Sequence, residues 1–252
     1  MKMIHKGIQK LFRQLNQKKY RDNLGLFMVE RTKVVDEILG KFPCRLLCAT
    51  HDYLLSHPQL PAEMIREVTE EDLSKVSELC TSREVVAVFE KPKHEVPKHV
   101  EGLVLALDDV QDPGNLGTIV RIADWFGIRD IVASRGTADV WSPKVVQATM
   151  GALARVRVTY VNDLPEWLKT QDVPVYGTFL DGENIYTKQL SSNGIIVMGN
   201  EGNGISPAVA RQVTENLLVP SYPAGDDTSE SLNVAVATAL VVGEFRRQLI
   251  IS

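Results

Sequence analysis

Apolar positions in the first 90 residues change repeatedly between helical and strand spacing. Ile4, Ile8, Leu11, Phe12 and Leu15 recur at helical intervals, so an amphipathic helix is expected at the start of the chain. Short apolar runs then predict strands, and the mixed segments between them predict helices. The strands are expected at 26–30, 45–50, 65–69 and 84–90, and the helices at 32–39, 52–56 and 70–79. This alternation predicts a small α/β domain.

A second alternating series begins after residue 100 and is more strongly apolar. Strands are predicted at 103–109, 130–134, 157–161, 173–179, 194–199 and 216–220, and helices at 115–126, 142–153, 206–213 and 231–249. Such apolar strands are typical of a mostly parallel sheet that helices cover on both faces. The proline-containing segment KPKHEVPKH (91–99) predicts a linker. The sequence therefore predicts an α/β chain with domains at 1–90 and 100–252.

Composition is that of an ordinary soluble protein, with 44% apolar and 24% charged residues in a chain of 252. The apolar run AVATALVV (235–242) is too short for a transmembrane helix, and the basic N-terminus lacks the apolar stretch of a secretory signal. Cys44, Cys48 and Cys80 form no CxxC pair, which favours structural cysteines in a reducing compartment. We therefore expect a cytoplasmic protein without membrane contact.

The net charge of −4 is distributed unevenly. Residues 1–99 carry 17 Lys and Arg against 14 Asp and Glu, whereas residues 100–252 carry 11 against 18. The first 21 residues contain seven cations and no acid. This asymmetry favours a polyanionic partner for the N-terminal part, with a solvated basic helix face as the alternative.

The segment DDVQDPGNLGTIVRIADWFG (109–128) leaves a predicted strand and starts a helix. Asn115 stands where an N-cap is expected. Neither capping nor turn chemistry explains Arg121. This side chain either forms a structural ion pair with Asp124 or Asp112, or presents a guanidinium to a phosphate or ribose at the ligand-binding edge of the sheet.

Two later segments contain more glycine or more polar side chains than folding requires. In GIIVMGNEGNGIS (194–206) a buried strand ends in a glycine-rich loop, whose backbone groups could contact a ligand. Glu201 is the only charged residue of that loop, which argues against a plain turn. In SESLNVAVATALVVGEFRRQL (229–249), Ser231 and Asn233 together supply more polarity than one helix cap needs.

Three motifs occur in order: N-x-G-x-x-x-R-x-A (115–123), G-N-E-G-x-G (199–204) and S-L-N-V-x-V-A (231–237). Together they resemble the signature motifs of the SpoU/TrmH family of RNA ribose 2′-O-methyltransferases, in the SPOUT superfamily. The resemblance covers residues 103–245. Through weaker motifs, the first 90 residues resemble that family's RNA-recognition domain, which is related to a ribosomal protein of the L30e type.

The resemblance implies a catalytic α/β domain with a deep trefoil knot, a topology that chain-connection rules argue against. It also implies homodimers packed through the catalytic domain. The co-substrate would be S-adenosylmethionine (SAM), with no metal, bound in a bent shape by the knot loops. Carried over to this sequence, the SAM-binding residues are Gly199, Asn200, Gly202, Gly204, Val219 and Leu232.

The resemblance further implies catalytic roles for Asn115, Arg121, Glu201, Ser231 and Asn233. The sulfonium of SAM makes its methyl group electrophilic, and the 2′-hydroxyl must be held in line with the C–S bond. A guanidinium keeps its proton below about pH 12, so we expect Arg121 to orient phosphate and hydroxyl rather than act as a base. Asn115 would hold Arg121 or the ribose. Glu201 would hold that arginine in place, or a residue that supports the site without touching the ligand. Ser231 and Asn233 would shape the floor of the site.

Two segments depart from the family pattern. Val219-Pro220-Ser221 stands where members read I-P-M, and YPAGDDTSE (222–230) lengthens the connection that follows, so the predicted wall of the SAM pocket is altered. Arg31 follows Glu30 where the family has E-G, which adds a cation to the N-terminal domain.

The leading interpretation is an enzyme that methylates a ribose 2′-hydroxyl of structured rRNA or tRNA, which the basic N-terminal domain would find. One alternative is a non-catalytic RNA-binding or ribosome-assembly factor on the same scaffold. Another is an unrelated nucleotide-binding α/β enzyme. The polar trio Asn115, Arg121 and Glu201 favours catalysis over binding alone. The lack of a phosphate-loop motif argues against the third interpretation.

Overall fold

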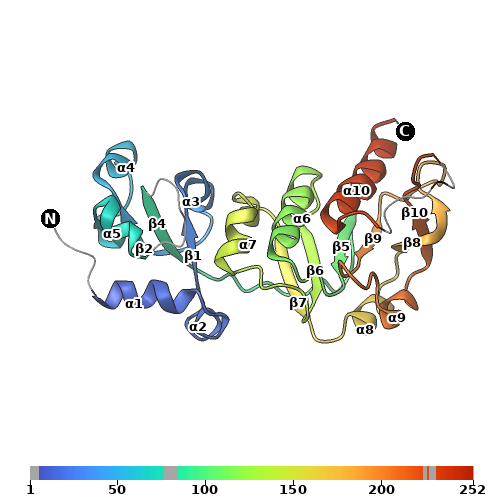
Figure 1. Ribbon diagram of the computed structural model, residues 1–252, viewed down its shortest axis with the longest axis horizontal. Helices are drawn as coiled ribbons and strands as arrows, with labels where there is room; N and C mark the ends of the chain where they lie inside the picture. Colours follow the sequence, from blue (N-terminus) through green and yellow to red (C-terminus); the bar gives the residue numbers. More distant parts are fainter. Residues whose placement is uncertain (1–5, 77–83, 224–225, 227–230, 252) are drawn as a thin grey trace. The chain divides into compact units, whose positions relative to one another are not determined.

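The computed structural model describes residues 6–76, 84–223, 226 and 231–251. The chain divides into two compact units, one of Met1–Lys93 with Asp139–Ala154 and one of His94–Ala138 with Arg155–Ser252. Figure 1 labels the elements of each unit. The expectations for Cys80 and for most of the 222–230 segment fall outside the described residues.

The first unit is built on a four-stranded sheet of order β1-β4-β2-β3. β4 runs antiparallel to β1 and β2, and β3 runs parallel to β2. The strands are β1 (Leu26–Glu30), β2 (Cys44–Ala49), β3 (Ile65–Glu67) and β4 (Val85–Glu90). The helices are α1 (Lys6–Leu15), α2 (Lys18–Leu24), α3 (Thr32–Ile38), α4 (His51–Ser56), η1 (Ala62–Met64), α5 (Glu70–Ser74), α7 (Pro143–Ala148) and η2 (Ala152–Ala154). All four strands predicted here are confirmed, whereas α2 was missing from the expected elements.

Each face of this sheet carries its own core, because side chains alternate along the strands. On one face, Met28 of β1 packs with Phe12 and Leu15 of α1. On the other face, Phe27 packs against Trp141, with ring centroids 4.7 Å apart. α1 therefore covers one face, and the 139–154 segment covers the other.

A buried ion pair fixes the 139–154 segment within the first unit. Nη2 of Arg21 lies 2.6 Å from Oδ2 of Asp139, and the two side chains are 3% and 10% exposed. Nη1 of Arg21 donates to the carbonyl oxygen of Leu15 at 2.7 Å. One guanidinium thus joins α1, α2 and the 139–154 segment.

The second unit is built on a six-stranded sheet of order β10-β8-β9-β5-β6-β7, in which every neighbouring pair is parallel. The strands are β5 (Leu103–Leu107), β6 (Asp130–Ser134), β7 (Arg157–Val161), β8 (Val175–Asn184), β9 (Gly194–Met198) and β10 (Glu215–Leu218). Figure 1 shows α6 (Pro113–Trp125) with α10 (Val234–Ile251) on one side of the sheet, and α8 (Leu164–Lys169) with α9 (Pro207–Ala210) on the other. The predicted α/β class with a mostly parallel sheet is confirmed.

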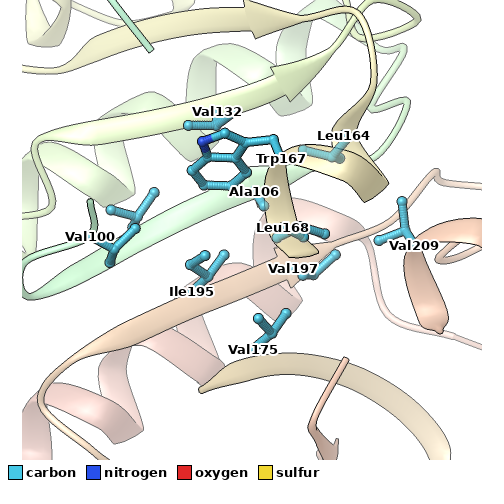
Figure 2. Packing of buried hydrophobic residues seen from close by; sticks show 11 residues of the cluster. Val100, Ala106, Val132, Leu164, Trp167, Leu168, Val175, Ile195, Val197 and Val209 are labelled. Carbon is cyan, nitrogen blue, oxygen red and sulfur yellow. The ribbon is translucent and has the colours of Figure 1, made fainter. Parts of the chain in front are cut away.

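The core between this sheet and α8 is shown in Figure 2. Trp167 and Leu168 of α8 pack against Ala106, Ile195 and Val197 of the central strands. Every residue of β5 and β9 is buried. Helices on both faces therefore explain why these strands read as continuous apolar runs.

The strand order reverses between β5 and β9. β6 and β7 lie beyond β5, while β8 and β10 lie beyond β9. Ligands of parallel α/β sheets bind where such neighbouring strands end at their carboxyl edge. The first motif follows β5 after the turn 108–112, and the second directly follows β9. The two motifs therefore meet at this edge.

Cys44 and Cys48 are free thiols in the first unit. Burial raises the pKa of the Cys48 thiol to about 12, so it stays protonated at neutral pH. This agrees with a structural rather than a reactive cysteine.

Among the described helices, none is long and apolar enough to cross a bilayer.

Candidate functional site

Side chains from three distant segments join in one chain of hydrogen bonds. Nδ2 of Asn233 donates to Oδ1 of Asn115 at 2.9 Å, and Nδ2 of Asn115 donates to Oε1 of Glu201 at 3.0 Å. The Glu201 carboxylate also accepts the backbone N–H groups of Asp112, at 3.0 Å, and of Gln111, at 3.1 Å. Three of the five predicted catalytic residues therefore lie together.

The first turn of α6 is capped differently from the prediction. Oδ1 of Asp112 accepts the N–H of Asn115 at 2.7 Å, and Pro113 begins the helix. Asp112 is therefore the N-cap, because the helix starts two residues earlier than predicted. The Asn115 side chain is not used for capping and can bridge Glu201 and Asn233.

Glu201 is held as a carboxylate. Partial burial raises its pKa, but hydrogen bonds from the Asn115 side chain and from the N–H groups of Asp112 and Gln111 outweigh that effect, and the pKa lies below its usual value. Glu201 is therefore charged at neutral pH and accepts several hydrogen bonds. Its described contacts go to Asn115 and to backbone, not to Arg121.

The glycine-rich loop after β9 is closed by its own backbone and by one side chain. Asn200 and Gly204 exchange N–H···O bonds of 2.9 Å in both directions. Oδ1 of Asn200 accepts the N–H groups of Gly202 at 2.9 Å and Asn203 at 3.0 Å, and its Nδ2 donates to the Asp109 carbonyl oxygen at 2.7 Å. Several N–H groups that we expected to be open to a ligand are thus used inside the loop, because Asn200 organises it.

The three glycines of this loop have different roles. A Cβ on Gly199 would lie 2.2 Å from the backbone carbon of Gly204 and 2.3 Å from the nitrogen of Ile205, so no side chain fits there. Gly204 has a φ of +66°, in the left-handed region that favours glycine. A Cβ on Gly202 would meet only Oδ1 of Asn200, at 3.7 Å. Gly199 and Gly204 therefore serve the loop's shape, and Gly202 leaves open space at its surface.

Two acidic residues that we predicted to end a strand instead support the site. Oδ2 of buried Asp108 accepts the N–H of Ser206 at 2.7 Å, which ties the end of β5 to the start of α9. Asp109 has a φ of +57°, and its carboxylate accepts the hydroxyl of Ser134 at the end of β6. The sequence contains a signal for this early strand end: two consecutive acidic residues rarely continue a buried strand.

Arg121 is exposed on α6, and no hydrogen bond or ion pair joins it to another described residue. Both acids considered as its partners are used elsewhere. Asp124 accepts Nε of Arg155 at 2.8 Å, and Asp112 caps the helix. The structural ion pair considered for Arg121 is therefore not observed.

Arg121 also lies apart from the Asn115 network. It shares the exposed face of α6 with Thr118 and Trp125, which are three and four residues away. Asn115 is six residues earlier and lies on a different side of the helix. The structure thus leaves this guanidinium open to solvent on the outer face of the helix.

The remaining predicted residues lie beside the network without joining it. Val219 follows β10 at the carboxyl edge of the sheet and is partly buried, and Leu232 is 48% exposed. Ser231 is exposed, and within the described chain it has no hydrogen bond to the network. Oδ1 of Asn233 accepts the N–H of Ala235 at 3.0 Å, so Asn233 both caps α10 and binds Asn115.

The described residues contain no group of three or more His, Cys, Asp or Glu side chains that could hold a metal ion. The site offers a fixed carboxylate, two oriented amides and a tight glycine loop, and the exposed guanidinium of Arg121 lies on the outer face of α6. These groups suit a polar organic ligand with hydroxyl and phosphate groups.

Two family models match the chain. The SpoU rRNA Methylase family matches residues 102–243, which contain all three motifs. The MRM3-like substrate binding domain matches residues 8–87.

Known proteins resemble the whole chain. The 23S rRNA (guanosine(2553)-2′-O)-methyltransferase RlmP of Bacillus subtilis (strain 168) is 32% identical over 244 residues, which span 93% of this chain and 94% of the relative. A TrmH-family structure from Porphyromonas gingivalis is 44% identical, with a TM-score of 0.89 over 98% of this chain and 100% of that one. The AdoMet-bound rRNA methyltransferase from Sinorhizobium meliloti is 29% identical, with a TM-score of 0.84 over 99% and 97% of the two chains.

Proposed function

The chain belongs to the SpoU rRNA methylase family, and from this premise we propose that it transfers a methyl group from SAM to a ribose 2′-hydroxyl of structured RNA, either rRNA or tRNA. The family resemblance and the enzyme class predicted from the sequence, a SAM-dependent RNA methyltransferase, are confirmed. The observation that carries the proposal is the hydrogen-bond chain Asn233–Asn115–Glu201, which unites all three motif segments at one sheet edge.

The groups around the glycine-rich loop fit SAM. Val219 and exposed Leu232 supply apolar surface beside polar backbone, which suits a ligand with a flat base and a polar tail. The open space at Gly202 permits close approach to the loop. Gly199, Asn200 and Gly204 hold the loop in that shape. When bound there, SAM supplies a methyl group activated by its sulfonium charge.

Arg121 binds an RNA phosphate beside the reacting ribose and stabilises negative charge that develops on the 2′-oxygen. Its guanidinium is exposed and unpaired among the described residues, so no internal bond must break before it binds RNA. The planar array of N–H donors matches a phosphate, and it keeps its charge throughout the neutral pH range. Its contribution is therefore electrostatic and positional.

Glu201 orients the amide groups for the substrate. Because its carboxylate accepts Nδ2 of Asn115, Oδ1 of Asn115 faces Nδ2 of Asn233. The two backbone bonds to Glu201 anchor this arrangement to the turn after β5. Asn115 and Asn233 thus present a preorganised polar surface to the ribose, and Ser231 completes its floor.

A homodimer formed through α6 and α10 accounts for the exposed apolar side chains of these helices. Trp125 is 85% exposed, and Val236 and Leu240 on α10 are 50% and 39% exposed. α6 and α10 pack against each other, so the three side chains belong to one helical layer (Figure 1). Such apolar surface is typical of an interface. A second copy over Trp125 would also lie beside Arg121.

Several family features are extended to this chain on the strength of its membership. The catalytic domain, 100–252, has a deep trefoil knot; in its parallel sheet β9 lies between β8 and β5. Residues 1–90 form an L30e-like RNA-recognition domain followed by the 91–99 linker. The cytoplasm, where RNA and SAM are both present, is the proposed location.

The test is transfer of a radiolabelled methyl group from SAM to a 23S rRNA transcript and to tRNA, followed by mapping of 2′-O-methyl positions. We expect one modified ribose in one of these RNAs, and its absence from cells that lack the gene. A protein that binds SAM but labels neither RNA, and whose loss leaves every cellular 2′-O-methyl position intact, would overturn the proposal.

A further inference from the structure

An open groove of about 460 Å³ lies along α1 and the start of α2 in the first unit. Its lining includes Lys6, Lys10, Arg13, Gln14, Gln17 and Tyr20. Resting on the methyltransferase function above, we propose that this groove binds an unpaired segment of the RNA substrate, with its phosphates along α1 and one base on Tyr20. Figure 1 shows α1 and α2 following one another along one side of the unit.

The positive charge of the groove comes from one row of side chains. Lys6, Lys10 and Arg13 are exposed and four or three residues apart, so they lie on one face of α1 about one helical turn from each other. α1 contains no acidic residue, and in the described part of the chain no carboxylate pairs with these three cations. Asp22 of α2 is engaged by Lys91 at 2.6 Å. The row is therefore available to a polyanion.

The opposite, apolar face of α1 packs on the core. Phe12 and Leu15 are 0% exposed and pack with Met28 and Leu73. The Arg21 guanidinium also binds the carbonyl oxygen at the end of this helix. A basic amphipathic helix binds a membrane by inserting its apolar face. Because that face is buried here, the cations are presented to a polyanion in solution.

The uncharged groups of the groove favour RNA over an acidic peptide. The Tyr20 ring is partly buried at the groove, which fixes it as a platform, and the amides of Gln14 and Gln17 lie beside it. An unpaired base stacks on such a ring and offers its edge to amide donors and acceptors. A peptide carboxylate would use the cations but has no need of this platform.

The experiment compares matched variants of the full chain. The test variant carries Lys6→Ala, Lys10→Ala and Arg13→Ala. The control carries Lys33→Ala, Lys41→Ala and Lys93→Ala, which removes the same charge from exposed positions of the same unit. Binding is measured by fluorescence anisotropy with a labelled single-stranded RNA oligonucleotide and with a 23S rRNA transcript, over a range of salt concentrations.

We expect the test variant to bind RNA at least about 10-fold more weakly. The slope of log affinity against log salt concentration should also become less steep by about 2, because three phosphate contacts are lost. The control should change neither quantity beyond about 2-fold. Tyr20→Ala should weaken binding about 10-fold and Tyr20→Phe should not, because stacking needs the ring and not the hydroxyl.

Other outcomes separate this inference from the proposed function. If the wild-type protein methylates RNA while the test variant binds RNA as tightly as the control, the groove assignment is wrong. The same conclusion follows if the test variant loses only its binding to phosphatidylserine vesicles. If RNA binding depends on the groove but no RNA is methylated, the groove stands and the enzymatic proposal fails.

Discussion

Arg21 and Arg121, in different units, use the same kind of side chain in different ways. Arg21 stabilises the fold, whereas Arg121 remains available for a ligand. Arg21 is 3% exposed and is held by Asp139 and by the Leu15 carbonyl. Arg121 is exposed and has no partner among the described residues. A buried guanidinium must have partners, because an unpaired buried charge is strongly destabilising. An exposed one needs none, so its charge can be used for binding.

The surroundings of the two arginines differ in the same way. Beside Asp139, Trp141 packs on Phe27 in an apolar core. At the carboxyl edge of the second sheet, Asn115, Glu201 and Asn233 bond to one another near solvent. Substitutions in the first region should therefore change stability, and substitutions in the second should change activity.

The largest effect is expected where the buried pair is broken. Arg21→Ala leaves the Asp139 carboxylate and the Leu15 carbonyl without their donor, so we expect a loss of about 3–5 kcal/mol in the free energy of unfolding. Urea denaturation measures this loss. Replacing both partners, with Arg21→Met and Asp139→Leu, should restore part of the stability, because no unpaired charge is left while the bonds to the Leu15 carbonyl and from the Trp141 N–H are still lost. A loss below about 1 kcal/mol in the single variant would show that the pair is not structural.

Arg121→Ala should show the opposite pattern. Loss of one charge-stabilising donor slows methyl transfer by about 100-fold or more, whereas an exposed substitution changes stability by no more than about 0.5 kcal/mol. Transfer kinetics and urea denaturation on one preparation provide both values. Arg129→Ala, at another exposed position of the same unit, should retain full activity. A destabilised Arg121→Ala protein would place Arg121 with Arg21 as a structural residue.

Substitutions in the glycine-rich loop of the second region should have effects of intermediate size on stability and SAM binding. Gly199→Ala forces a Cβ against backbone at 2.2 Å, so we expect about 1–3 kcal/mol of destabilisation together with weaker SAM binding. Gly202→Val should weaken SAM binding without lowering the melting temperature, since space there is open. Calorimetric titration with SAM and thermal unfolding distinguish the two variants. Unchanged SAM affinity in Gly202→Val would remove this loop from the cofactor site.

The smallest effect concerns the charge of Glu201. Its folded pKa lies below the ordinary value of 4.5, so it contributes stability above that pH, and this stability is lost as the pH falls through the folded pKa. Because the side chain is exposed, the contribution is about 0.5 kcal/mol or less. Glu201→Gln should therefore be slightly less stable than wild type at neutral pH, and this difference should shrink as the pH falls through the folded pKa. A difference that grows in acid would contradict the hydrogen-bonded carboxylate.

Much of the fold could be predicted because its strands are apolar runs with clear ends. β6 and β7 coincide with the predicted 130–134 and 157–161. Errors occur where polar residues serve the site or where an element is short. β5 ends before Asp108 and Asp109 because these acids turn into the site, and α8 has six residues, too few to show a helical period.

The candidate residues of the site could be predicted, but their partners could not. Glycines and polar side chains in excess of folding needs pointed to Glu201 and Asn233, and the family resemblance pointed to Asn115. Asn115 and Glu201 are 86 positions apart, and only the adjacency of β5 and β9 brings them together. Periodicity identifies buried strands without giving their order, so it cannot supply such a contact.

The motif segments work as one unit through the bond between Asn115 and Glu201. A double-mutant cycle of Asn115→Ala and Glu201→Ala on the single-turnover rate of methyl transfer tests it most directly. We expect the double variant to be about as slow as the slower single variant. Rate losses that multiply in the double variant would contradict it, because the two side chains would then act independently.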